Sequence, residues 1–291
     1  MTRPLTTQNR RPFPREHVAV AAFVLFGLIL IAAITLIYIF SRARMFRSLP
    51  THVAVLLVAC VRLVIASLEF GIPPSSSSQR GRAESAMAIL DAISLVPLLL
   101  VPITMPRYMD FITGKLSNNT RPSPKESGKT SSLIAILKRN WKPVTVGMLS
   151  LIGASFIVTG SGVAFSNSAP DTAAIGVLCA GVFLDVVIAW GLCFTAWHRF
   201  FTTDRKMVDD LVPWYLPIMA STPFLIVRLV WAVGSAFSVQ LPGALFSPFR
   251  NTDKSTWANL GMVVVMEFLV STVCLFMGLG QVGWSVVRNQ H

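Results

Sequence analysis

The 291-residue sequence is 53% apolar and only 13% charged, and its formal net charge is +12. A soluble domain carries about 25% charged residues, so this composition excludes an ordinary soluble fold. The basic residues lie between apolar runs rather than in one patch interleaved with aromatic residues, which argues against nucleic acid as a partner and favours topology signals and contacts with lipid headgroups.

Seven apolar runs follow one another along the chain. A helix needs about 20 residues to cross the hydrocarbon core of a bilayer, at a rise of about 1.5 Å per residue. The sequence therefore predicts an all-α membrane protein, a bundle of seven transmembrane helices in contact with the lipid bilayer. The expected spans are 18–40, 52–71, 86–106, 144–167, 172–196, 211–238 and 257–284.

A basic tail, residues 1–17, precedes the first run, as it would in a secretory signal peptide. The run is too long for a signal peptide, and the sequence Ser-Arg-Ala-Arg at 41–44 stands where a cleavage site of small residues would be. We therefore expect a helix that stays in the protein. A single seven-helix domain is expected over 18–287, followed by a C-terminal tail at 288–291.

Lysine and arginine are distributed unequally between the two sides of the predicted bundle. The connections after the first, third and fifth runs hold 15 of them together with the C-terminal tail, whereas the N-terminal tail and the other connections hold 8. By the positive-inside rule, we expect the N-terminus in the lumen or outside and the C-terminus in the cytosol. The expected location is the endoplasmic reticulum or another endomembrane, as a multi-pass integral protein.

The longest connection, 107–143, separates the third and fourth runs. Its basic, polar stretch at about 114–132 has little to bury and is expected to be disordered. The stretch that follows, 133–142, either forms a short helix on an anionic surface or begins the fourth span.

Prolines fall inside the third and sixth runs. A proline removes a backbone hydrogen bond and clashes with the preceding helical turn, so it tends to kink the helix. We expect kinks that widen the bundle locally at Pro97, Pro102, Pro217 and Pro223.

Six charged residues remain inside the predicted spans. They are Arg62, Glu69, Asp91, Asp185, Arg228 and Glu267. Six unpaired charges would cost about 15–20 kcal/mol, which exceeds the stability of a typical fold, so these side chains must face one another or water. Their positions place all six in one half of the membrane, between the centre and roughly 10 Å toward the outer face.

Two hypotheses explain these charges. In the first, pairs of arginine and carboxylate hold the helices together. In the second, an acid-lined pocket opens toward the outer leaflet, and Glu267, which has no cation within a turn of its own helix, is a neutral acid that donates a proton. The second hypothesis predicts catalytic roles for Glu267, Glu69 and Asp185, and binding or partner roles for Arg62, Arg228, Asp91, Trp231 and Trp190.

Motifs for metals and cofactors are absent from the sequence. The four histidines, His17, His52, His198 and His291, lie at or beyond the ends of the spans, and no pair of aspartate-rich motifs for magnesium diphosphate occurs. The four cysteines lie inside spans and form neither a disulfide framework nor a zinc spacing. No nucleophile-elbow, Walker or dinucleotide motif is present. We therefore expect neither a cofactor nor a metal.

Four short stretches resemble a known family. They are VRLVIASLE at 61–69, AILDAISLVPLLL at 88–100, PFLIVRLVW at 223–231 and MEF at 266–268. With these stretches the chain resembles a family of fungal seven-helix integral membrane proteins of largely unassigned function, in which the position of Asp91 is often Asn and that of Trp231 often Tyr. The resemblance implies a fungal source and a helical bundle, and it implies no reaction.

The chain is also similar to the small membrane-bound terpene cyclases of fungal meroterpenoid pathways, which are helical bundles of comparable length. The shared features are several intramembrane acids, no metal motif and an apolar interior. This resemblance implies a metal-independent cyclase, an isomerase or lyase of secondary metabolite biosynthesis, that protonates a lipophilic isoprenoid substrate with a carboxylic acid. Two other classes stay open: a seven-helix receptor or lipid sensor, and a small-molecule or proton-coupled transporter.

Overall fold

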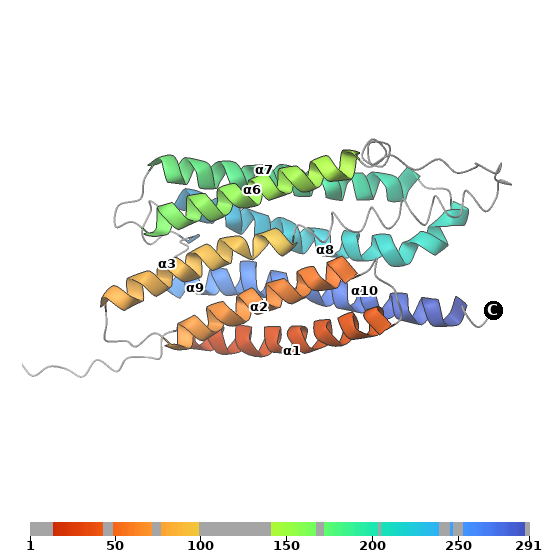
Figure 1. Cartoon of the computed structure of the whole chain (residues 1–291), viewed down its shortest axis with the longest axis horizontal. Coiled ribbons are helices and arrows are strands. Elements are labelled where there is room, and N and C mark those ends of the chain that lie inside the picture. Colours follow the sequence, from red (N-terminus) through yellow and green to blue (C-terminus); the bar gives the residue numbers. More distant parts are fainter. Residues whose placement is uncertain are drawn as a thin grey trace, which may run out of the picture.

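A computed structural model describes residues 14–42, 49–71, 77–98, 141–166, 172–202, 205–238, 245–246 and 253–288. These residues form an all-α bundle of seven helical rods that lie side by side (Figure 1), which confirms the predicted fold class. The last rod is continuous but contains three elements, because a π-helix interrupts it. The elements are α1 (Pro14–Arg42), α2 (Leu49–Gly71), α3 (Ser77–Ile93), α6 (Trp141–Ser166), α7 (Thr172–Thr202), α8 (Arg205–Phe237), α9 (Asp253–Asn259), the π-helix η2 (Leu260–Val265) and α10 (Met266–Arg288).

Among the described residues, five helices are long and apolar enough to cross a membrane. They cover Glu16–Arg42, Leu49–Gly71, Thr172–Thr195, Ile218–Phe237 and Lys254–Gly280. Two shorter apolar helices, Ser85–Leu98 and Met148–Val163, occupy the places of the predicted third and fourth spans. Large apolar side chains on the outer surface are exposed, as on a surface that meets lipid. The chain is a multi-pass integral membrane protein.

Several predictions concern residues outside the described ranges. These are the N-terminal tail up to residue 13, the loop at about 114–132, Pro102 and the last three residues. The third predicted span is described as far as Leu98, and the fourth helix begins at Trp141.

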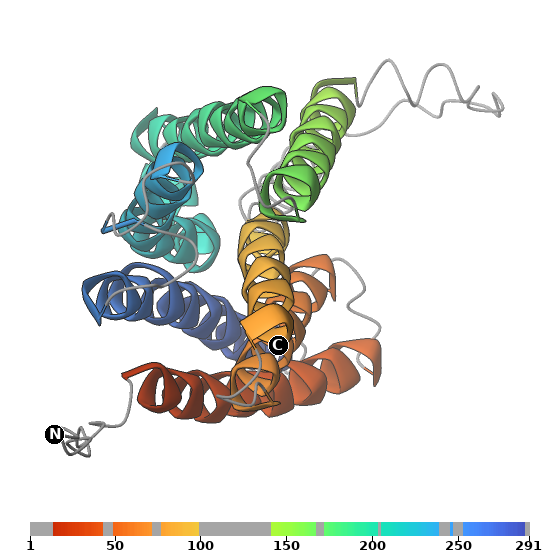
Figure 2. The same cartoon turned by 90° about the vertical axis from the view of Figure 1, so that its left-hand side faces the viewer.

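The bundle has two apolar cores. The first core lies among α1, α2, α8 and α10 and includes Leu98 of the segment after α3, and the second lies among α3, α6, α7 and α8. Viewed from its end, the bundle has α10 between α1 and α8, with the pair α6 and α7 on the far side of α8 (Figure 2). Helix α8 contributes Ile218 and Leu225 to the first core and Leu229 and Ala232 to the second. It therefore links the two halves of the bundle.

Glycines bring α6 and α7 unusually close together. A Cβ atom at Gly160 would lie 2.5 Å from the backbone nitrogen of Leu178, and one at Gly181 would lie 2.8 Å from the carbonyl oxygen of Gly153. Small residues at such positions let membrane helices approach at backbone distance. The close approach leaves little space between the two helices for anything but small side chains.

Two interruptions of regular α-helix lie next to buried charges. The α-helical pattern stops at Ser94 and resumes at Leu95, three and two residues before Pro97, which cannot donate a backbone hydrogen bond to the preceding turn. The second interruption is η2, which ends directly before α10 and its Glu267. Helix α8, in contrast, continues through Pro217 and Pro223.

Candidate functional site

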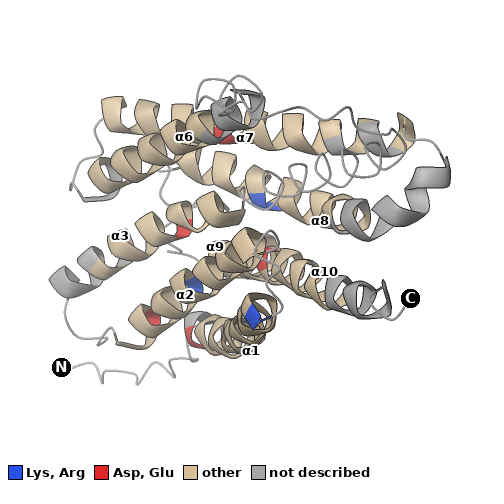
Figure 3. Cartoon of the chain, turned by 45° about the vertical axis from the view of Figure 1, so that its right-hand side comes forward, with Lys and Arg blue, Asp and Glu red and all other residues tan. Residues whose placement is uncertain are grey.

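Four charged side chains and one serine meet where the two halves of the bundle join. We call them the polar cluster, and each residue is at most 7% exposed. Few of the described residues carry a charge at all (Figure 3), so this concentration is distinctive. The members are Arg62 of α2, Asp91 of α3, Ser94 in the turn after α3, Arg228 of α8 and Glu267 of α10.

Two guanidinium groups hold the carboxylate of Glu267. Arg62 binds it with two hydrogen bonds, in which Nε donates to Oε2 at 2.5 Å and Nη2 donates to Oε1 at 2.6 Å. Arg228 approaches from another helix, and its Nε donates to Oε1 at 2.7 Å. Charge-assisted and bidentate hydrogen bonds are the strong ones in proteins. Glu267 is therefore an anion fixed between α2 and α8.

Asp91 completes the charge balance and also contributes its backbone. Its Oδ1 lies 2.6 Å from Nη1 of Arg62. Nη2 of Arg228 donates to the carbonyl oxygen of Asp91 at 2.7 Å, and the hydroxyl of Ser94 donates to the same oxygen at 2.7 Å. Because the α-helix is interrupted at Ser94, this carbonyl oxygen can accept hydrogen bonds from side chains.

The polar cluster is neutral overall, with two guanidinium groups and two carboxylates. The prediction that Glu267 is a neutral acid is therefore wrong. No cation lies within a turn of its own helix, but Arg62 of α2 and Arg228 of α8, which were predicted as partner residues, both bind its carboxylate. The alternative hypothesis, that pairs of arginine and carboxylate join the helices, agrees with the observed geometry.

The two other intramembrane acids lie apart from the polar cluster. Asp185 of α7 is fully buried, and neither of its carboxyl oxygens has a hydrogen-bond partner among the described residues. Its carboxyl group lies against Gly153 of α6, so closely that a Cβ atom at Gly153 would overlap it. Glu69 is half-buried near the end of α2.

The polar cluster leaves little open space. A cavity of about 20 Å³ lies beside Asp91 and Arg228, and it is also lined by Val182 and Ser235. Such a volume suits about one water molecule. This small cavity is the open space that the structure shows beside the charged side chains.

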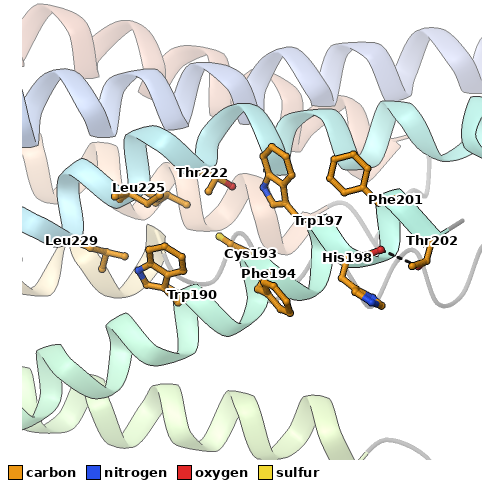
Figure 4. Close-up of a pocket in the computed structure, with 12 residues that line it drawn as sticks. Trp190, Cys193, Phe194, Trp197, His198, Phe201, Thr202, Thr222, Leu225 and Leu229 are labelled. Atoms are coloured by element: carbon orange, nitrogen blue, oxygen red, sulfur yellow. Dashed lines mark hydrogen bonds between the residues drawn. The ribbon is translucent and has the colours of Figure 1, made fainter.

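A larger cavity lies elsewhere among the described residues, as a groove of about 500 Å³ between α7 and α8. We call it the α7–α8 groove. Figure 4 shows its side chains, with Trp190 and Leu229 toward one end and His198 and Thr202 toward the other. The size is that of a typical small-molecule site. The lining residues are Ala189, Trp190, Cys193, Phe194, Trp197, His198, Phe201, Thr202, Thr222, Leu225, Ile226 and Leu229.

Only one of the predicted aromatic binding residues lines this groove. Trp190 does, whereas Trp231 is fully buried and packs against Phe246 with ring centroids 5.7 Å apart. The other groove residues were not predicted, although the sequence carries a signal for them. Aromatic residues recur at 190, 194, 197 and 201, a spacing that places them along one face of a helix.

Titratable residues in the described part of the chain form no metal site. No group of three or more His, Cys, Asp or Glu side chains is placed there to hold a metal ion. All four cysteines are free thiols.

Comparison with known proteins identifies a family and little else. Residues 14–282 match the family described as Domain of unknown function (DUF7702). The match covers all seven helical rods, the polar cluster and the α7–α8 groove. No curated protein matches the chain, and no solved structure does.

Proposed function

The chain belongs to the DUF7702 family, whose description names no activity, and we propose that it is a metal-independent membrane isomerase or cyclase that protonates a lipophilic isoprenoid substrate. One observation carries the proposal. Asp185 is a buried carboxyl group without a hydrogen-bond partner among the described residues, and it lies on the helix that forms one wall of the α7–α8 groove.

Asp185 replaces Glu267 as the proton donor. An isolated carboxylate is costly to bury, so a carboxyl group in such surroundings keeps its proton. A neutral carboxyl group is able to act as a general acid. Glu267 has no proton to give, because two guanidinium groups bind it as an anion.

Asp185 lies about one helical turn before the part of α7 that lines the groove. Asp185 and Ala189 are four residues apart, so they lie on the same face of the helix and about 6 Å apart along its axis. Ala189 lines the groove and directly precedes Trp190, which lies at the same end as Leu229 (Figure 4). Asp185 itself does not line the groove, so proton transfer requires its side chain to leave the contact with Gly153 and the substrate to reach past this apolar end.

The chemistry that we propose needs no oxidant, reductant or metal. A proton from Asp185 adds to the terminal epoxide oxygen or alkene of an isoprenoid chain, and the resulting cation closes carbon–carbon bonds. The Asp185 carboxylate regains a proton when the last cation loses one and forms a double bond, so the donor is restored and the product is an isomer of the substrate. Aromatic rings such as those of Trp190 and Trp197 stabilise cations through their π-faces. General acid catalysis contributes about 10²- to 10⁴-fold, and the folded placement of the chain contributes the remainder.

The test is product formation in a heterologous fungus supplied with epoxidised farnesyl-phenols. The parent protein should yield a cyclised isomer, and Asp185→Asn should yield none at equal protein level. Glu16→Gln, an acid-to-amide change at the exposed start of α1, is the matched control and should leave the yield unchanged. Unchanged product from Asp185→Asn would remove Asp185 as the donor.

A lipid sensor is the second candidate function. It is favoured because no carboxyl group is among the described residues that line the groove, and because the Asp185 carboxyl lies on the α6 side of α7. In that case the groove binds its ligand and releases it unchanged. Recovery of intact farnesyl-phenol from the purified parent protein, with no isomer after prolonged incubation, would favour the sensor over the enzyme.

A further inference from the structure

The α7–α8 groove extends along one half of the membrane. It follows α7 from Ala189 to Thr202, which corresponds to about 20 Å at the rise of an α-helix. The membrane-crossing part of α7 ends at Thr195, so the end of the groove at His198 and Thr202 lies in the interfacial region. From Ala189 to Thr195 the groove covers about 9 Å of the membrane-crossing part. One leaflet accounts for about 15 Å of the hydrocarbon core, so the groove matches the outer part of one lipid tail together with its head.

The groove opens sideways rather than toward water. Trp190 is 56% exposed, and Phe194 and Phe201 are each 69% exposed, although all three line the cavity. In a membrane helix, such exposure means contact with lipid. An occupant therefore enters from the leaflet, with its long axis parallel to α7.

The charges and hydrogen-bonding groups of the lining residues determine which kind of polar head group an occupant can have. None of the described lining residues is Lys, Arg, Asp or Glu, so the described lining offers hydrogen-bonding groups and no charge to the head of an occupant. The hydroxyls of Thr222 and Thr202 already donate to the carbonyl oxygens of Ile218 and His198, at 2.7 and 2.9 Å. The imidazole of His198 is exposed, and a neutral imidazole offers one donor and one acceptor.

We infer that the groove binds a single-chain amphiphile whose uncharged, hydroxyl-bearing head contacts His198 and whose apolar tail runs toward Ala189 and Leu229. This inference rests on the proposed function and adds the class and direction of its substrate. In this direction the far end of the chain, where a terminal alkene or epoxide would be, comes nearest to Asp185.

Photolabelling tests the direction of binding. Two farnesyl-phenol probes carry a diazirine, one on the phenol ring and one at the end of the chain, and the protein is the full chain in nanodiscs with Asp185→Asn to prevent turnover. The ring probe should label α7 near His198, and the chain-end probe should label α7 or α8 near Ala189 and Leu229. The inference is overturned if the two patterns are exchanged, or if α1, outside the groove, is labelled as strongly.

Binding measurements test the uncharged head and the role of His198. Loss of one hydrogen bond in His198→Ala should weaken farnesyl-phenol binding about 2- to 10-fold. His17→Ala, the same change at the exposed start of α1 and outside the groove, is the matched control and should bind as the parent does. Farnesol should displace the probes at lower concentration than farnesyl phosphate. Equal binding by His198→Ala, or preference for the phosphate, would contradict the inference.

The two proposals fail separately. Labelling in the expected direction without any cyclised product would support the inferred amphiphile site and contradict the proposed enzymatic function. Cyclised product with labelling in the opposite direction would support the proposed enzymatic function and overturn the inferred direction of binding.

Discussion

Replacing Glu267 by glutamine tests the polar cluster most severely. The change removes the negative charge that receives hydrogen bonds at 2.5, 2.6 and 2.7 Å from two guanidinium groups. The buried cluster then carries a net charge of +1, with only Asp91 to compensate Arg62 and Arg228. The amide NH₂ of glutamine also faces donors, so it cannot replace both carboxylate oxygens.

The magnitude follows from the cost of an uncompensated buried charge. Breaking a buried ion pair on one side costs about 3–5 kcal/mol, which corresponds to roughly 10²- to 10³·⁵-fold in the folding equilibrium. We therefore expect Glu267→Gln to unfold at a clearly lower fraction of SDS in mixed micelles, followed by tryptophan fluorescence. The chain contains 7 tryptophans, and Trp231 is fully buried one turn after Arg228, so the signal reports on this region.

Asp185→Asn is the matched control, because it is also an acid-to-amide change at a fully buried position. No described residue pairs with the Asp185 carboxyl, so this variant should unfold at the same SDS fraction as the parent or a higher one. If Glu267→Gln is as stable as the parent protein, the two arginines do not depend on Glu267 and the geometry of the polar cluster is refuted.

Three further predictions address other contacts. Arg228→Leu should lower the free energy of unfolding by about 3–5 kcal/mol. Adding Glu267→Leu should restore part of this loss, because a balanced pair of one arginine and one aspartate remains. If the losses of the two single variants simply add in the double variant, as measured by SDS titration, the pairing of Arg228 with Glu267 is contradicted. Gly153→Ala should destabilise the protein, because the added methyl group overlaps the Asp185 carboxyl, and the loss of stability should be smaller in a protein that also carries Asp185→Ala. Equal losses from Gly153→Ala in the parent protein and in Asp185→Ala would show that the two residues do not touch. If the loop that carries the acceptor site Asn118 is cytosolic, Asn118 should stay unglycosylated, and a glycosidase-sensitive mass shift that disappears in Asn118→Gln would invert the orientation.

The helices could be predicted because a membrane span has a simple signal. The predicted spans 18–40, 52–71 and 172–196 differ by only a few residues from the membrane-crossing segments Glu16–Arg42, Leu49–Gly71 and Thr172–Thr195. A run of apolar residues long enough to cross the bilayer suffices for this, whatever the helices contact. The same physics required the buried charges to meet one another.

The partners of those charges could not be predicted. Arg62 and Glu267 are 205 positions apart in the chain, and their contact depends on how α2 and α10 pack. Two local irregularities also matter: the interrupted helix at Ser94, which exposes the Asp91 carbonyl, and the π-helix that precedes Glu267. A π-helix inserts an extra residue and so changes which side of the bundle the following residues face. No simple sequence pattern predicts a π-helix.

The α7–α8 groove was not predicted either, because it also depends on how helices pack. The sequence directed attention to charged residues, whereas the cavity between α7 and α8 is lined almost entirely by apolar and aromatic side chains. Such residues are normally read as lipid-facing or core positions. Only the packing of α7 against α8 distinguishes a groove from an ordinary membrane surface.

Infrared spectroscopy of the purified protein distinguishes the two acids, because a protonated carboxyl group has a C=O stretching band that a carboxylate lacks. We expect such a band in the parent protein from Asp185, its loss in Asp185→Asn and its persistence in Glu267→Gln. A band that persists in Asp185→Asn and disappears in Glu267→Gln would show that Glu267, and not Asp185, is the neutral acid.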